Sequence, residues 1–172
     1  MERRVIANFE RAFDEADRMD VYQAWVQLNT AIKGHMDLRR YELATIAAAQ
    51  RLRSTYCSCA HGKVLRETFG APVREIVLDR RSAGLDEVDL AVMDLAERVV
   101  DDAASIGDED TEPLRRLGLS EAEIMDVVLA ASARCFFSKA LDGAGVLADE
   151  HYRDLPEELL EVLVVGKPIA GA

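Results

Sequence analysis

Apolar side chains recur every three or four residues along nearly the whole chain, and no stretch alternates convincingly between apolar and polar positions. This spacing is typical of helices that bury one face. Glycines, prolines and cap residues divide it into predicted helices at 4–16, 20–33, 38–53, 54–69, 72–80 and 85–104, a short piece ending at 118, a helix at 120–141 and a last short one from 156. The sequence therefore predicts an all-α fold.

Several residues mark the ends of these helices. The side chains of Asp37 and Ser54 are of the kind that accept the free N–H groups at the start of a helix, so each is predicted to begin one. Ser120, with Glu123 three residues later, forms a capping box and is the clearest start signal in the chain. Gly34 is expected to close the second helix.

Two segments are predicted to be irregular. Residues 108–112 carry four carboxylates and are expected to form a solvated loop, because they lack the ligand spacing of a calcium-binding loop. The tail after the last helix is expected to fray. No linker is long enough to separate two units, so we expect one helical domain over residues 1–172, with its core motif at about 38–66.

The stretch 42–62 has a faint echo at 123–143, with equal separations between corresponding residues. This pattern predicts a helix-pair pseudo-repeat related by a pseudo-two-fold axis. Ser138 stands in the second copy where Cys57 stands in the first, so only the first could perform thiol chemistry. Chance resemblance between two alanine-rich helices is the competing explanation.

Composition narrows the function classes. Aromatic residues make up 6% of the chain and apolar residues 49%, which fits closely packed helices. The formal net charge of −11 argues against binding to nucleic acid or to an anionic membrane, since both need a basic surface. We therefore expect no nucleic acid and no membrane among the partners.

Compartment follows from the termini and the cysteines. Residues 1–8 contain charge but no apolar stretch behind it, so they are not expected to be a signal peptide. The longest apolar run, 159–165, is too short to span a bilayer. Three cysteines, two of them crowded at Cys57 and Cys59, do not form the framework of a secreted disulfide protein. A cytoplasmic location is expected.

The candidate chemistry centres on Cys57 and His61, which share one helix face because they are four residues apart. With Ser54 as cap, Cys57 lies in the first turn, where the helix dipole favours a thiolate. His61 can accept the thiol proton, and Glu42 on the preceding helix can orient the imidazole. The alternative is structural, since a buried cysteine is often only a small hydrophobic residue.

A metal site is not expected. Cys57, Cys59 and His61 are a possible zinc set, but alternate residues on a helix cannot converge on one ion, and a fourth ligand is not evident. No phosphate loop and no serine-hydrolase motif is present. The sequence accordingly predicts neither a metal nor a cofactor.

Residues 40–65 resemble the core of the AhpD-like/carboxymuconolactone decarboxylase superfamily, in particular its uncharacterised peroxidase-related members. The pattern of that superfamily is a glutamate, a helix, and then Cys-x-x-Cys-x-x-x-His at the start of the next helix. Glu42, Cys57 and His61 match the glutamate, the second cysteine and the histidine. The likeness extends over about residues 20–147, through the downstream Gly118-Leu119-Ser120 and Asp142-Gly143.

The resemblance implies a thiol-dependent peroxidase. In the family the second cysteine reacts with a hydroperoxide, the first resolves the sulfenic acid as a disulfide, and the histidine and glutamate relay the proton. A lipoyl-type or other thiol reductant then restores the pair. Members usually assemble as trimers or hexamers, so a homo-oligomer is expected here, with a dimer also open.

Departures from the family pattern matter as much. Ser54 occupies the position of the resolving cysteine, and Tyr56 a position that can carry a relay histidine; both are expected to hydrogen-bond near the Cys57 sulfur. A small thiol in solution is the favoured resolving partner. Cys59 is a second redox candidate and, like Cys135, could resolve Cys57 only after a rearrangement.

The leading hypothesis is thus reduction of an organic hydroperoxide at Cys57, with His61 as base and Glu42 as its orienting group. One alternative is a lyase that decarboxylates a small organic acid through His61 and Glu42. The other is a non-catalytic helical oligomer that kept the scaffold.

Overall fold

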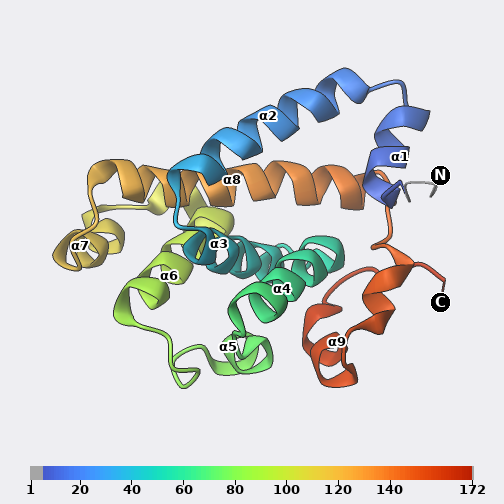
Figure 1. The fold of residues 1–172 in the computed structure, drawn as a ribbon. Coiled ribbons are helices and arrows are strands. Elements are labelled where there is room, and N and C mark those ends of the chain that lie inside the picture. Colours follow the sequence, from blue (N-terminus) through green and yellow to red (C-terminus); the bar gives the residue numbers. More distant parts are fainter. Residues whose placement is uncertain (1–5, 172) are drawn as a thin grey trace.

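One long helix, α8 (Glu121–Gly143), runs along most of the molecule (Figure 1). The computed structural model describes residues 6–171, and this part of the chain forms helices and no strands. The all-α prediction is confirmed. The remaining elements are α1 (Asn8–Glu15), α2 (Met19–His35), α3 (Leu38–Arg51), α4 (Thr55–Phe69), α5 (Val73–Asp79), α6 (Glu87–Asp102), η1 (Ala103–Ser105), α7 (Asp108–Arg116), η2 (Glu150–Asp154) and α9 (Glu157–Leu163).

Helix α3 forms the centre of the core and packs against α4, α6 and α8. Every residue from 41 to 49 is buried, and four of these nine are alanines, which allow neighbouring helices to approach closely. Asp37 caps α3 as predicted, because its side chain accepts a hydrogen bond from the Arg40 N–H at 3.0 Å. Glu42 is therefore carried into the buried centre of the core.

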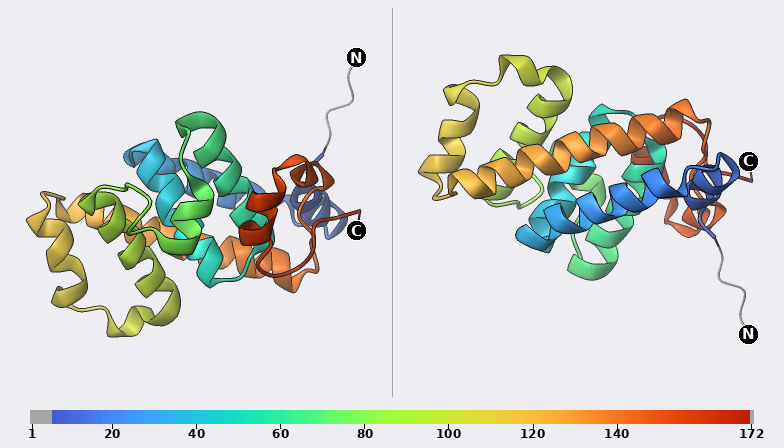
Figure 2. Two further views of the ribbon diagram at one scale, coloured as in Figure 1. Left: turned by 90° about the horizontal axis from the view of Figure 1, so that it is seen from below. Right: turned by 90° about the horizontal axis from the view of Figure 1, so that it is seen from above.

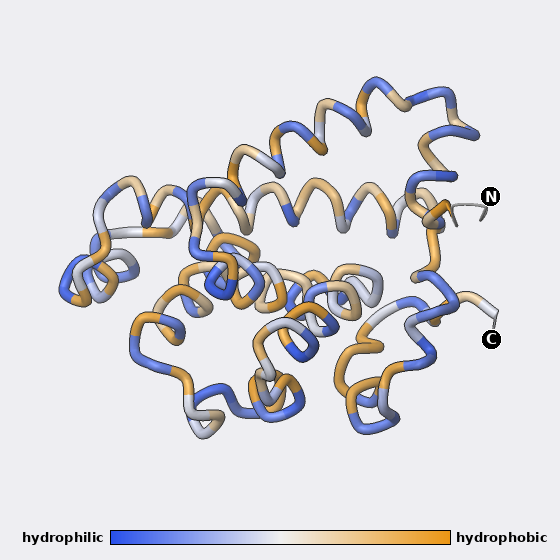
Figure 3. Tube along the Cα trace, in the orientation of Figure 1, coloured by the Kyte–Doolittle hydropathy of each residue, from blue (hydrophilic) through white to orange (hydrophobic). Residues whose placement is uncertain are grey.

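Helix α2 packs against α8, and the two lie side by side in the view from above (Figure 2, right). Polar and apolar positions are mixed along both α2 and α8, as expected for helices that bury one face (Figure 3). The predicted stop at Gly34 is wrong, since α2 continues through Gly34 to His35. A Cβ added at Gly34 would meet no atom within 4 Å, so the packing does not require a glycine at this position.

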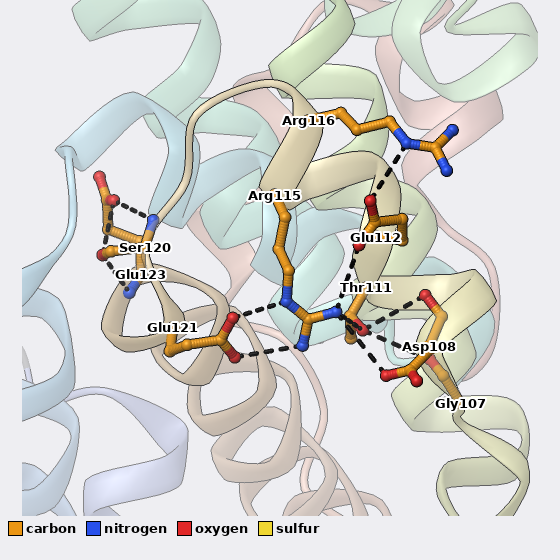
Figure 4. A network of polar contacts seen from close by, with 9 residues as sticks. All are labelled: Gly107, Asp108, Thr111, Glu112, Arg115, Arg116, Ser120, Glu121 and Glu123. Carbon is orange, nitrogen blue, oxygen red and sulfur yellow. Dashed lines mark hydrogen bonds and ion pairs between the residues drawn. The ribbon is translucent and has the colours of Figure 1, made fainter.

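The predicted acidic loop at 108–112 is also wrong, because these residues open helix α7. Their carboxylates lie in its first turns, where they interact favourably with the helix dipole. The carboxylate of Asp110 accepts a hydrogen bond from the Gly107 N–H at 3.0 Å. Arg115 ties α7 to α8 through Glu121, close to the Ser120–Glu123 capping box that the sequence predicts (Figure 4).

The C-terminal tail is packed, which corrects the expectation that it frays. Ile169 is buried and pairs with Ala148 in an isolated bridge. The Gly166 N–H donates to Thr55 Oγ1 at 3.0 Å, and Arg53 Nε donates to the Val165 carbonyl at 3.1 Å. The tail thus fixes the corner between α3 and α4.

The two segments of the predicted pseudo-repeat differ in local structure. Residues 42–62 span two helices and the corner between them, whereas 123–143 lie within the single helix α8. Residues 123–143 are therefore not a second copy of the α3–α4 helix pair. The equal spacings reflect the shared helical period of two alanine-rich segments.

Two predictions concern the ends of the chain. The start of the first helix at Arg4, and most of the segment 1–8, lie outside the described residues. Within residues 6–171, no helix is both long enough and apolar enough to cross a membrane.

Candidate active site

The corner between α3 and α4 places Cys57 in the first turn of α4. Arg53 adopts a left-handed conformation, with φ of 55°, which turns the chain sharply between the helices. Ser54 occupies the N-cap position, but its side chain makes no capping hydrogen bond, so this part of the prediction is wrong. Cys57 is the third residue of the helix, near the positive end of its dipole.

Glu42 and His61 meet across the α3–α4 interface. His61 Nδ1 lies 2.6 Å from Glu42 Oε2, and Lys33 Nζ donates to Glu42 Oε1 at 3.3 Å. The Glu42 side chain is 1% exposed and the His61 side chain 12%. The predicted pairing of the two residues is thus present in the structure, and Lys33 of α2 is an additional partner that sequence reasoning missed.

The protonation states of this pair follow from its surroundings. Burial and the nearby Arg134 guanidinium lower the pKa of His61, and they outweigh the opposing effect of Glu42. Burial works to raise the pKa of Glu42, but His61 and Lys33 bring that pKa below its ordinary value. Near neutral pH the imidazole is therefore neutral, donates its Nδ1–H to the carboxylate, and keeps Nε2 as an acceptor.

These shifts predict that the protein loses stability in acid. Because the folded-state pKa of His61 lies below the unfolded value of 6.5, its contribution is present above pH 6.5 and declines as the pH falls below it. The lowered pKa of Glu42 extends the loss below pH 4.5. Urea unfolding over a pH series measures the effect.

His61→Gln is expected to flatten the upper part of that pH dependence, just below pH 6.5. The matched control is His151→Gln, which alters an exposed histidine away from this pair. An unchanged slope in His61→Gln contradicts the assignment.

The Cys57 sulfur has two hydrogen-bond partners on α8 that the sequence reasoning missed. Ser138 Oγ lies 3.1 Å from Cys57 Sγ, and Arg134 Nη1 lies 3.6 Å from it. Arg134 Nη2 also donates to the Tyr41 hydroxyl at 3.2 Å. All four residues are buried. The sulfur thus lies against a guanidinium and a hydroxyl, between α4 and α8.

Ser54 and Tyr56 are not partners of the sulfur, which corrects their predicted role. The Tyr56 hydroxyl donates to the Asp149 carboxylate instead. Burial and this hydrogen bond raise the pKa of Tyr56. The hydrogen bonds to Cys57 Sγ come from Arg134 and Ser138, because α8 occupies that side of the sulfur.

The other two cysteines are free thiols. Cys59 has no exposed surface, and burial together with the neighbouring Cys57 raises its pKa to about 12. Cys135 is partly exposed, and burial raises its pKa as well. Both thiols are therefore protonated near neutral pH, when they are poor nucleophiles. Whether either resolves Cys57 stays a prediction.

Arg134 has a sequence signal that could have identified it. The buried face of α8 includes Val127, Ala131, Ser138 and Leu141, and Arg134 falls on the same face by helical spacing. A charged residue on an apolar face needs a partner or a function.

Among residues 6–171, no cluster of His, Cys, Asp and Glu is arranged to hold a metal ion.

A comparison of the sequence with known families matches residues 19–98 to the carboxymuconolactone decarboxylase family. This range contains α2, α3 and α4 and therefore Lys33, Glu42, Cys57 and His61. No curated protein matches the sequence significantly.

Solved structures share the fold at low sequence identity. An uncharacterised peroxidase-related protein from Ralstonia eutropha JMP134, described as an alkylhydroperoxidase AhpD core, superposes on this chain with a TM-score of 0.77 at 19% sequence identity. The superposition covers 94% of this chain and 83% of that one. An uncharacterised peroxidase-related protein from Silicibacter sp. TM1040 superposes with a TM-score of 0.72 at 20% identity, over 84% of this chain and 76% of that one. A protein of unknown function from Agrobacterium tumefaciens superposes with a TM-score of 0.65 at 19% identity, over 74% of this chain and 90% of that one. The predicted AhpD-like fold is confirmed.

Proposed function

We propose that this chain belongs to the AhpD-like/carboxymuconolactone decarboxylase superfamily and is a thiol-dependent peroxidase that reduces organic hydroperoxides at Cys57. The thiolate sulfur attacks the hydroperoxide oxygen that bears hydrogen, and the O–O bond breaks. Cys57 becomes a sulfenic acid, and the alkoxide leaves and takes up a proton. The sulfur is oxidised and the hydroperoxide is reduced to an alcohol.

The observation that carries the proposal is the buried Glu42–His61 pair one helical turn beyond Cys57. A neutral imidazole held by a carboxylate is suited to proton transfer, because its free nitrogen can take and return a proton. His61 lies on the same face of α4 as Cys57 by its four-residue spacing. Its proposed role is to transfer protons between the reacting groups and solvent.

The reductant is proposed to be a low-molecular-weight or lipoyl-type thiol. Ser54 stands where the family has its resolving cysteine, and the buried Cys59 has a raised pKa of about 12. One external thiol condenses with the sulfenic acid to a mixed disulfide and releases water. A second thiol, from another small molecule or from the same lipoyl group, attacks the reductant sulfur of that disulfide, which restores Cys57 and releases the reductant as its own disulfide.

A homo-oligomer is proposed from the exposed apolar side chains of α2 and α8. Val21, Leu28 and Phe136 are 39%, 53% and 49% exposed and line one apolar groove with Trp25. Light scattering measures the mass of the assembly, and a monomeric mass contradicts the proposed homo-oligomer.

The proposed location is the reducing cytoplasm, which the free thiols fit. Fractionation of cells tests this location.

The test of the proposed function is turnover. The wild-type protein is expected to consume an alkyl hydroperoxide in the presence of excess small thiol, faster than the thiol alone. Glu42→Gln is expected to slow this rate by about 100-fold, because it removes the carboxylate that orients His61. Glu67→Gln, which changes a half-exposed carboxylate on α4, is the control and should have little effect. Wild-type turnover no faster than the thiol alone contradicts the proposal.

A lyase remains the second candidate, and one observation favours it. The hydrogen bonds to Cys57 come from α8, whereas His61 is paired with Glu42, so that pair does not require the thiol. Decarboxylation of a small organic acid by His61 and Glu42 would survive Cys57→Ser, whereas peroxidase turnover would not. If neither reaction is detected in the wild type, the non-catalytic scaffold takes their place.

A further inference from the structure

Helix α8 carries a guanidinium in the protein core. Arg134 is 3% exposed, and in the described part of the chain its hydrogen bonds go to Cys57 and Tyr41 and to no carboxylate. Its Nε is buried and has no hydrogen-bond partner among residues 6–171. Burying a cation without an anionic partner is unfavourable. The charge of Arg134 therefore needs a compensating group nearby.

Aromatic rings enclose the guanidinium on another side. Its central carbon lies 5.9 Å from the centroid of the Trp25 ring and 5.8 Å from that of Phe137. These two rings stack on each other at 3.7 Å. Ring faces attract a cation only weakly compared with a full negative charge, and they lower the local polarity. The charge of Arg134 thus acts strongly on the atoms it contacts.

We infer that Arg134 and Ser138 are catalytic residues that hold the Cys57 sulfur as a thiolate. The guanidinium supplies the opposing charge, and the Ser138 hydroxyl donates a hydrogen bond to the sulfur at 3.1 Å. A thiolate at Cys57 is the anionic partner that Arg134 otherwise lacks. The inference rests on the proposed function only in taking Cys57 as the reacting thiol.

This assignment separates the two halves of the site. Arg134 and Ser138 of α8 keep the sulfur charged before the substrate arrives, so His61 is not required to deprotonate it. The Arg134 charge also helps to keep His61 neutral. His61 is then free to act as a neutral relay, which takes a proton from solvent at Nε2 and passes it to the leaving alkoxide.

The test is the ultraviolet absorbance of thiolate near neutral pH, taken as the difference between a protein and its Cys57→Ser counterpart. Cys59 and Cys135 contribute little there, because both have raised pKa values. The wild type is expected to show a Cys57-dependent signal. Arg134→Gln should lose it, Arg134→Lys should retain most of it, and Ser138→Ala should weaken it. Arg116→Gln, a change of a 75% exposed arginine, is the control.

The rate of reaction with an alkyl hydroperoxide is measured on the same variants. Arg134→Gln is expected to slow it by at least about tenfold, as for loss of a hydrogen bond to a charged group. Absence of the thiolate signal in the wild type, or its retention in folded Arg134→Gln, overturns the inference. If Arg134→Gln does not fold, an undiminished signal in Ser138→Ala or its loss in folded Arg134→Lys overturns it instead.

The two proposals fail separately. An Arg134-dependent thiolate without any reaction with hydroperoxide supports the inference and contradicts the peroxidase. Reaction with hydroperoxide at an equal rate in wild type and folded Arg134→Gln, with an equal thiolate signal, supports the peroxidase and contradicts the inference.

Discussion

Cys57→Ser is expected to abolish the thiol-dependent consumption of alkyl hydroperoxide, down to the rate of the reductant alone. The hydroxyl of serine is not ionised near neutral pH, and it cannot take up the peroxide oxygen as the cysteine sulfur does when it forms a sulfenic acid. The substitution keeps the size of the side chain nearly constant, and serine can still accept hydrogen bonds from Ser138 and Arg134. Loss of turnover would therefore reflect lost chemistry and not lost structure.

Cys135→Ser is the matched control for this variant. Cys135 lies on α8 beside Arg134, is partly exposed and has a raised pKa. If a small thiol resolves the sulfenic acid, Cys135→Ser should turn over like the wild type. Turnover that survives in Cys57→Ser contradicts a reacting Cys57 and favours another thiol or the lyase.

Gly166→Ala is expected to lower the free energy of unfolding by about 3 kcal/mol, the upper range for overpacking of a well-packed site. A Cβ at this position would lie 2.0 Å from the Arg53 carbonyl oxygen, which is backbone and cannot move aside cheaply. The clash would displace the tail from the α3–α4 corner and break its hydrogen bond to Thr55. For a chain of this length the melting temperature should fall by about 6–12 °C.

Gly34→Ala is the control, since it makes the same change where there is room. Gly34 lies exposed within α2, and nothing is within 4 Å of an added Cβ. Alanine loses less conformational freedom than glycine on entering a helix, so the free energy of unfolding of this variant should rise by about 0.5–1 kcal/mol. Equal melting temperatures for Gly166→Ala and the wild type would show that the tail does not hold the corner.

Helical spacing made most of the fold predictable. The three- and four-residue period located the helices, and Asp37 and Ser120 marked two starts through side chains that accept backbone N–H groups. The period could not reveal that the acidic residues 108–112 begin a helix, because their stabilisation comes from the dipole and from Gly107. Packing of the tail depends on contacts with Arg53 and Thr55, which lie far away in the sequence.

The pairings within the site were predictable only where the residues are near in sequence. Glu42 and His61 belong to consecutive helices, so their spacing predicted the pairing that the structure contains. Arg134 and Ser138 come from a helix about 80 residues later, and no local pattern relates them to Cys57. Ser54 and Tyr56 were assigned to the sulfur by their closeness in sequence, whereas the helix directs their side chains elsewhere.

The most direct measurement of the central claim is to map the oxidised residue after a single turnover. The protein is mixed with one equivalent of alkyl hydroperoxide without reductant, a sulfenic acid-specific reagent is added, and the labelled peptide is identified by mass spectrometry. We expect the label on Cys57, with labelling slowed in His61→Ala and absent in Cys57→Ser. No label in the wild type, or a label on Cys135 with Cys57 still reduced, would contradict the account.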